Sequence, residues 1–159
     1  LLQNMDEYCQ NGILIAATNH HELLDSAIWR RFQTVIEMPK PELAEVASMI
    51  KNMPEFIDVS QIKPGQWKKV YDALLGLSYS DIKNILNNMV KKLVLKDENK
   101  VKFTDILVEA YLFKNHGNYT MEQMVQYMID HGVSQKQASL YFNVSTRQIK
   151  NCLERSEKN

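Results

Sequence analysis

The stretch from Gly12 to Phe32 reads GILIAATNHHELLDSAIWRRF, and the interpretation of the whole chain starts from it. Its first part, Ile13–Ala17, is an uninterrupted apolar run that follows a glycine and ends at the polar pair Thr18-Asn19. Short apolar runs bounded in this way are typical of strands buried on both faces, which occur mostly in parallel sheets. The sequence therefore predicts a parallel strand over residues 13–17.

Polar side chains suited to a phosphate ligand follow this predicted strand. Asn19 stands at its carboxyl end, where open α/β sheets bind their ligands. A short helix is predicted over 22–29, and Arg30 and Arg31 follow it with two planar guanidinium groups, which match the geometry of phosphate. Plainer interpretations stay open, since asparagine is a common turn residue and an arginine pair is usually a solvated surface feature.

The rest of the chain is predicted to be mainly helical. A second strand over 34–38 is rich in β-branched residues and is stopped by Pro39. Apolar residues at helical spacing then predict helices over 41–53, 66–75 and 78–95, and a last one that has Thr104 as its N-cap and ends before Asn115. The predicted fold class is thus mainly α with a partial parallel α/β sheet at the N-terminus.

These segments together resemble the second half of an AAA+ ATPase module, over roughly residues 1–114. The strand that ends in Thr-Asn, the segment LDSA at 24–27 and the segment RRF at 30–32 are most similar to the branch that includes the katanin, spastin and Vps-type ATPases. In that family a helix with a similar Leu-Leu-x-x-Met-Asp precedes the sensor strand, and Leu1–Cys9 is predicted to be the end of such a helix.

The resemblance implies roles in ATP hydrolysis for three residues of the opening stretch. Asn19 would be the first sensor, which orients the attacking water near the γ-phosphate. Arg30 and Arg31 would be arginine fingers, which act on nucleotide bound to the neighbouring subunit of a ring, a hexamer at full length. A positive charge against the transferring phosphoryl group is worth roughly 10³–10⁵ in rate.

The segment GLSYSDI at 76–82 has the outline of the family's Gly-Tyr-Ser-Gly-Ala-Asp-Ile, the second sensor region, at which the lid approaches the base and ribose. The resemblance implies nucleotide binding by Ser78, Tyr79, Ser80 and Asp81, although Tyr79 and Ser80 replace the small glycine and alanine of the family. Tyr79 has two open interpretations, stacking on adenine or filling space. The plainer interpretation of the segment is a capping box, Ser78 with Asp81, that starts a helix.

The motifs that hold the phosphates and Mg²⁺ in such ATPases are missing from the sequence. No G-x-x-x-x-G-K-[ST] is present, and Asp6-Glu7 follows no apolar strand that would make it a Walker B motif. We therefore expect a fragment that begins within the module and is inactive alone, with ATP and Mg²⁺ bound only by the full-length protein. In the family's sheet the strand of the Walker A motif lies between the two predicted here, so residues 1–40 are not expected to form that sheet unaided.

Three capping boxes follow in the last part of the chain, Thr120 with Gln123, Ser134 with Gln137 and Ser145 with Gln148. They predict helices over 121–131, 135–141 and 146–155, joined by short loops. The segment from Gly132 to Ile149 resembles a helix-turn-helix of the Fis or transposase type, with Asn143 in the turn, where its left-handed conformation is tolerated. The predicted domains are thus 1–40, the end of the AAA+ core, 41–116, the helical lid, and 117–159, the helix-turn-helix-like tail.

The outward face of this tail offers side chains that suit double-stranded DNA. Arginine and asparagine read base edges in the major groove, and lysine and threonine suit phosphates. The predicted DNA-binding residues are Lys136, Thr146, Arg147, Lys150, Asn151 and Arg155. A three-helix protein-binding module is the alternative, because nearby acidic residues offset much of this positive charge and phosphate neutralisation dominates affinity for DNA.

The composition is that of an ordinary globular protein. The 159 residues are 45% hydrophobic, and 19 Lys and Arg balance 19 Asp and Glu. This balance gives no global argument for binding to nucleic acid or to an anionic membrane.

Cys9 and Cys152 favour free thiols in a reducing, cytoplasmic compartment. No apolar run reaches the ~18 residues of a membrane span and no leader is present, so no membrane partner is expected. His20-His21 have no ligand partners at metal spacing, so no metal site is predicted.

The sequence thus favours a fragment of an AAA+ ATPase with a DNA-binding tail. A DNA-binding regulator with a degenerate AAA+ module that serves only oligomerisation is the second interpretation. A protein-remodelling ATPase whose tail grips protein is the third. The upstream sequence separates the first two, because only the first requires an intact Walker A lysine.

Overall fold

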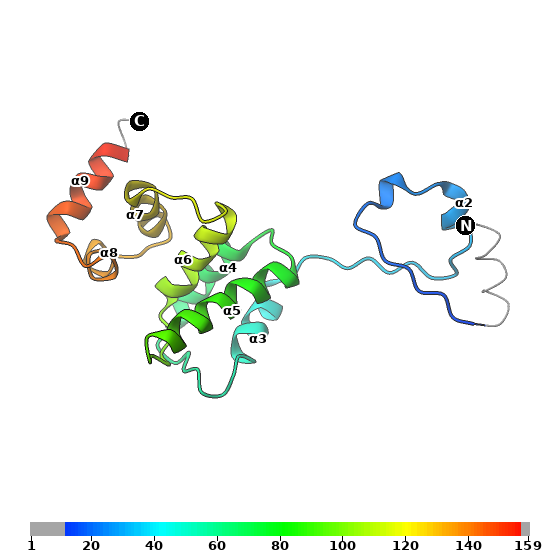
Figure 1. Cartoon of the computed structure of the whole chain (residues 1–159), viewed down its shortest axis with the longest axis horizontal. Coiled ribbons are helices and arrows are strands. Elements are labelled where there is room, and N and C mark those ends of the chain that lie inside the picture. The colour runs from blue at the N-terminus through cyan, green and yellow to red at the C-terminus, as the bar shows by residue number, and fades with distance from the viewer. Residues whose placement is uncertain (1–11, 157–159) are drawn as a thin grey trace. The chain divides into compact units, whose positions relative to one another are not determined.

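The computed structural model describes residues 12–156, and the chain divides into two compact units between Pro39 and Lys40 (Figure 1). Each unit is described by itself. The helix predicted over 1–9, the Asp6-Glu7 pair and Cys9 lie outside the described residues. The domain boundaries predicted near residues 40 and 116 stay predictions, and the second of them falls inside the second unit.

The described part of the first unit, residues 12–39, contains a single turn of 3₁₀-helix, η1 (His21–Leu23), and one short helix, α2 (Ser26–Trp29). The carboxylate of Asp25 starts α2 by accepting a hydrogen bond from the backbone N–H of Ala27 at 2.8 Å. The helix predicted over 22–29 is therefore present as two short pieces, because Leu24 between them has extended backbone angles.

Neither strand predicted in the first unit forms, and the prediction of a partial parallel sheet is wrong for residues 12–39. Ile13 and Ile15 are 91% and 86% exposed, and Met38 is 89% exposed. Between residues 12 and 156 the one β-pairing is an isolated bridge from Asp58 to Lys100. The physical reason is that a strand satisfies its backbone groups only against a neighbour, and these two segments do not pair with each other.

The second unit begins with four helices over the residues predicted to be the lid, and these four helices keep that name below. They are α3 (Leu43–Lys51), α4 (Pro64–Leu74), α5 (Tyr79–Leu95) and α6 (Phe103–Lys114), and they confirm the predicted helices to within a few residues. Helix α4 begins earlier than predicted because Pro64 occupies its first position, which suits a residue without an N–H donor.

The start of α6 corrects one prediction. Thr104 is not the N-cap but lies inside the helix, where its side chain is buried. Lys102 is the N-cap, and its backbone N–H donates to the Asp105 carboxylate at 2.8 Å. The sequence offered Thr104 as a good capping residue, but the burial of Phe103 in the core moves the helix start upstream.

The tail adds three helices, α7 (Met121–Asp130), α8 (Gln135–Phe142) and α9 (Thr146–Ser156). The three predicted capping boxes are confirmed, with N–H to hydroxyl distances of 3.2 Å for Gln123 to Thr120, 3.3 Å for Gln137 to Ser134 and 3.3 Å for Gln148 to Ser145. Asn143 ends α8 in the left-handed region with φ 54°, as predicted for the turn.

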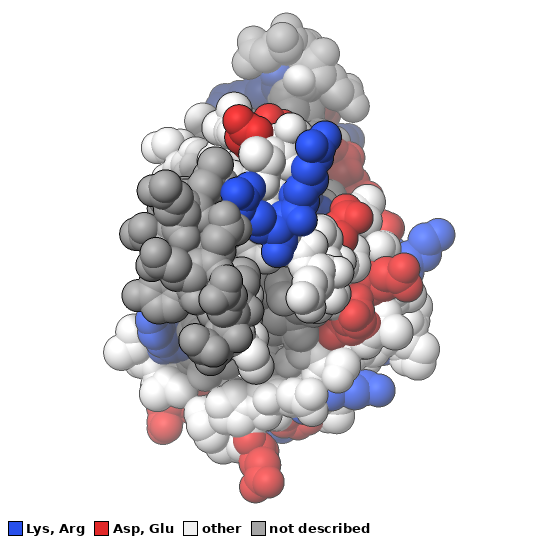
Figure 2. Space-filling view, turned by 90° about the vertical axis from the view of Figure 1, so that its right-hand side faces the viewer, with Lys and Arg blue, Asp and Glu red and all other residues white. Residues whose placement is uncertain are grey.

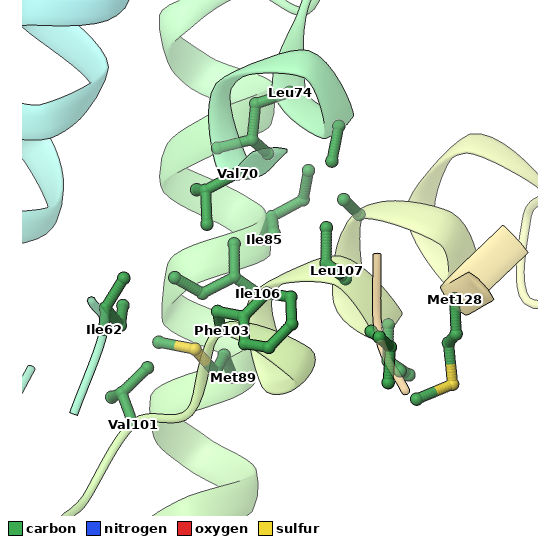
Figure 3. Close-up of a cluster of buried hydrophobic side chains, with 14 of the residues drawn as sticks. Ile62, Val70, Leu74, Ile85, Met89, Val101, Phe103, Ile106, Leu107 and Met128 are labelled. Carbon is green, nitrogen blue, oxygen red and sulfur yellow. The ribbon is translucent and has the colours of Figure 1, made fainter. Parts of the chain in front are cut away.

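One continuous core joins the lid to the tail. Figure 3 shows Ile85 of α5 and Leu107 of α6 in the same cluster as Met128 of α7. Helix α6 packs against α4, α5 and α7, and the rings of Tyr111 on α6 and Tyr127 on α7 lie 4.7 Å apart between centroids. The tail therefore packs directly on the lid.

Gly132 allows a second close approach between lid and tail. It follows α7 with φ 77°, a conformation that side-chain-bearing residues rarely adopt. A Cβ at this position would lie 1.8 Å from Nζ of Lys69 on α4. The Lys69 ammonium donates to the carbonyl oxygen of Gly132 at 3.4 Å.

Truncation of the central core should destabilise the protein strongly. Leu107 is fully buried, so Leu107→Ala is expected to lower the free energy of unfolding by about 2–5 kcal/mol in urea titrations. The matched control is Leu95→Ala on α5, since Leu95 is 86% exposed. The control should stay within about 0.5 kcal/mol of the parent, and equal losses in both variants would contradict this core.

Alanine should destabilise the protein more at Gly132 than at Gly65. Gly132→Ala is expected to lower the free energy of unfolding by about 1–2 kcal/mol because of the left-handed backbone, with the displacement of Lys69 in addition. Gly65 on α4 has open space around it, so Gly65→Ala should be neutral or raise stability by up to about 1 kcal/mol. Chemical unfolding of both variants checks this, and a neutral Gly132→Ala would contradict the described turn.

Candidate functional site

The first unit carries the residues predicted to sense and stabilise phosphate. Asn19 lies in an exposed bend. The backbone turn beside it is held by Thr18, whose hydroxyl accepts a hydrogen bond from His20 N–H at 3.0 Å. The Asn19 side chain is thus not required for that contact, and it is presented to solvent in the described unit.

The two arginines of the predicted finger pair have different surroundings. Arg31 is half-buried, and its Nη1 donates to the carbonyl oxygen of Ala27 at 2.9 Å, one turn back along the chain. Arg30 is exposed at the end of α2. Figure 2 shows Lys or Arg side chains gathered on the face turned to the viewer. Of the pair, Arg30 is thus the more exposed, while Arg31 contacts the helix that precedes it.

In the lid, Ser78 and Asp81 form the predicted capping box at the start of α5. Ser78 N–H and Oγ donate to Oδ2 of Asp81 at 3.1 and 2.8 Å, and Asp81 N–H donates to Ser78 Oγ at 3.2 Å. These side chains are therefore used to build the helix end. Ser80 is exposed beside them.

Tyr79 makes a contact that sequence reasoning missed. Its hydroxyl interacts with the carboxylate of Glu45 on α3, and this interaction raises the pKa of Tyr79 and lowers the pKa of Glu45. The Glu45 carboxylate also accepts from the N–H of Glu42 at 2.8 Å and so caps α3. The segment proposed to meet nucleotide thus interacts with α3. No local pattern signals this interaction, because the partners are 34 positions apart in the sequence.

In the tail, the exposed side of α9 carries most of the predicted DNA-binding residues. Ile149 and Cys152 are buried on the opposite side of the helix. The exposed residues are Thr146, Arg147, Lys150, Asn151 and Arg155 on α9, and Lys136 in the first turn of α8. The structure therefore brings five of the predicted residues onto one helix.

Arg155 differs from the rest of that face. Its Nη1 lies 3.8 Å from Oε1 of Glu122 on α7, so its charge is partly balanced within the tail. A pocket of about 740 Å³ opens beside this pair, between α6, α7 and α9. The hydroxyl of Tyr127 at this pocket is buried without a hydrogen-bond partner, and burial raises the pKa of Tyr127 to about 12. The phenol is consequently neutral at physiological pH.

No three His, Cys, Asp or Glu side chains within residues 12–156 are grouped so that they could hold a metal ion. In the same part of the chain, every helix is too short or too polar to cross a membrane.

Comparison with known proteins finds AAA-family ATPases. The uncharacterized AAA family ATPase y4kL of Sinorhizobium fredii is 31% identical over 109 residues, which are 66% of this chain and 31% of that protein. The ATP-dependent zinc metalloprotease FtsH of Staphylococcus haemolyticus is 30% identical over 116 residues, 67% of this chain and 15% of the relative. FtsH 1 of Methylacidiphilum infernorum is 30% identical over 117 residues, again 67% of this chain, and 17% of the relative.

The chain thus spans less than a third of the length of these relatives, at most 31%. No family model matches the chain, and no solved structure does. None of these relatives is named as a katanin, spastin or Vps-type ATPase, so that branch stays a prediction. The helix-turn-helix also stays a prediction. Over about two thirds of its length, this chain has AAA-family ATPases as its homologues.

Proposed function

We propose that this chain is the C-terminal part of an AAA+ module, of the katanin, spastin and Vps-like branch, in a protein that hydrolyses ATP as a ring. The observation that carries the proposal is the similarity to AAA-family ATPases over 66–67% of the chain, two of which are named as ATP-dependent. In this proposal α3 to α6 are the helical lid. The parent protein supplies the phosphate loop and the acid that binds Mg²⁺, and neighbouring subunits are its partners.

Within that ring, Asn19 and Arg30 have the roles of first sensor and arginine finger. The exposure of Arg30 at the end of α2 supports an action on the nucleotide of a neighbouring subunit. Arg31 acts beside it, and its bond to the Ala27 carbonyl supports a positioning role. Ser78 to Asp81 form the lid's side of the nucleotide site, with Tyr79 adjacent to the base.

The tail is proposed to bind double-stranded DNA through α9. The exposed cationic and amide side chains on one side of that helix support this, together with the left-handed Asn143 that turns α8 into α9. In such motifs the second helix enters the major groove. ATP hydrolysis in the ring would then act on DNA or on a protein bound to DNA.

A protein partner for the tail is the second candidate, and one observation favours it. On α8, Leu140 is 72% exposed and Tyr141 is 42% exposed, and large apolar side chains of this kind mark protein-binding surfaces when they are contiguous. The ring would then remodel protein. In the remaining alternative the phosphate loop is degenerate, and the AAA+ module serves only for oligomerisation in a DNA-binding regulator.

The arginine finger is tested in the full-length protein that carries this chain. Arg30→Ala should lower kcat of ATP hydrolysis by about 10³-fold or more, since the finger stabilises charge on the transferring phosphoryl group, and Arg31→Ala should lower kcat less. The chain by itself should show no turnover. Turnover by the isolated chain that is lost in Arg30→Ala/Arg31→Ala would overturn the proposal.

Action in trans is tested by mixing subunits. Rings of Arg30→Ala subunits and rings of subunits without the phosphate-loop lysine should each be inactive. A mixture should recover part of the activity, because some interfaces pair an intact finger with an intact nucleotide site. Failure to recover any activity in mixed rings, shown to be mixed by tagged pull-down, would place Arg30 in its own subunit's site.

DNA binding is tested by fluorescence anisotropy of the chain on random-sequence duplex over a salt series. Arg147→Ala/Lys150→Ala should weaken binding and reduce the magnitude of the slope of log K against log salt, by up to about 1.8 if both contact phosphate. The control Lys83→Ala/Lys91→Ala removes the same charge from exposed positions on α5. Binding isotherms of the α9 double variant that equal those of the parent would exclude this face.

A further inference from the structure

The contact between Lys69 and Gly132 places a lid cation at the entrance of the tail motif. Lys69 lies on α4, and its Nζ is 3.4 Å from the carbonyl oxygen of Gly132 in the turn between α7 and α8. This approach depends on glycine, since a Cβ on residue 132 would lie 1.8 Å from that nitrogen. Lys69 of the lid therefore contacts the backbone just before α8 begins.

The backbone on each side of this contact is anchored by packing. On the lid side, Val70 and Leu74 of α4 are buried in the core that Figure 3 shows, which anchors the helix that carries Lys69. On the tail side, Val133 beside Gly132 is 2% exposed, and Met128 is fully buried in the same core. Helix α4 and the turn before α8 are thus parts of one packed body.

Helix α8 has the place of the first helix in a helix-turn-helix. In that motif the helix before the recognition helix crosses the backbone while the next one enters the major groove. Lys136, in the first turn of α8, is exposed, so Lys69 and Lys136 supply two cations near one helix end. An ammonium has three donors, and the Gly132 carbonyl uses one of those of Lys69, which leaves two for phosphate oxygens.

We propose that Lys69 of the lid contacts a DNA phosphate, so that the DNA-binding surface spans both lid and tail. This inference rests on the DNA-binding role proposed for the tail. It adds a residue outside the helix-turn-helix to that surface. Because Lys69 belongs to the lid, DNA bound at the tail would also touch the element that closes over nucleotide.

The test is the salt dependence of binding of random-sequence duplex DNA to the whole chain, measured by fluorescence anisotropy. Lys69→Ala should reduce the magnitude of the slope of log K against log salt by about 0.9, the value for one phosphate contact. Lys69→Arg should restore the slope because it keeps the charge. Lys69→Gln, which keeps a donor for the Gly132 carbonyl but no charge, should behave as Lys69→Ala.

Lys68→Ala is the matched control. Lys68 is exposed on the same helix, and consecutive residues of an α-helix project about 100° apart, so this variant removes the same charge from a different direction. It should leave the slope close to that of the parent. Circular dichroism and thermal unfolding confirm that each variant is folded at the temperature of measurement.

The outcomes separate this inference from the function on which it rests. If Arg147→Ala/Lys150→Ala flattens the slope and Lys69→Ala does not differ from Lys68→Ala, the tail binds DNA and the lid contact is wrong. If neither the α9 variant nor the Lys69 variant changes binding, the DNA-binding role is wrong and the inference falls with it. A loss in Lys69→Ala that Lys69→Gln restores would assign Lys69 a structural role only.

Discussion

Helix α6 is buried along almost its whole first half, and the second unit is assembled around it. Its residues from Phe103 to Ala110 are all buried except Asp105, so that helices must cover it on several sides, and α4, α5 and α7 do so. One of these residues is charged. Glu109 is 8% exposed, and its carboxylate is paired with the ammonium of Lys92 on α5. A buried carboxylate without such a partner would be strongly destabilising, which makes this pair a condition for the packing of α5 on α6.

The same helix explains why lid and tail form one body. Its last turns carry Tyr111, whose ring contacts that of Tyr127 on α7 in a tilted arrangement. The core of the tail, with Met128, Ala138 and Ile149, continues from there. If the proposed function is correct, a movement of the lid upon nucleotide binding or hydrolysis would be transmitted to α9 without a hinge between them. The interaction of Tyr79 with Glu45 would then link the proposed nucleotide segment to α3.

The two units differ in how far their backbone N–H and C=O groups are satisfied within the chain. A helix satisfies its own N–H and C=O groups, so α3 to α9 form from local sequence and then pack. A strand depends on a neighbour that can lie far away in the chain. Ile13, Ile15 and Met38 therefore remain exposed, although they have the composition of buried strands. The proposed ATPase role accounts for this contrast, since the family's sheet places a further strand between these two.

The sequence by itself determined the helices, their caps and the turn at Asn143, because these depend on residues within three or four positions of one another. It also carried the resemblance through which Asn19, Arg30 and Arg31 were singled out. Only the tertiary structure decided that α6 begins before Thr104 and that Arg155 faces Glu122. Only it showed that Tyr79 interacts with Glu45 and that Lys69 donates to the carbonyl oxygen of Gly132. Such contacts join residues far apart in sequence, or depend on which side chains the core buries, and both follow from packing rather than from local pattern.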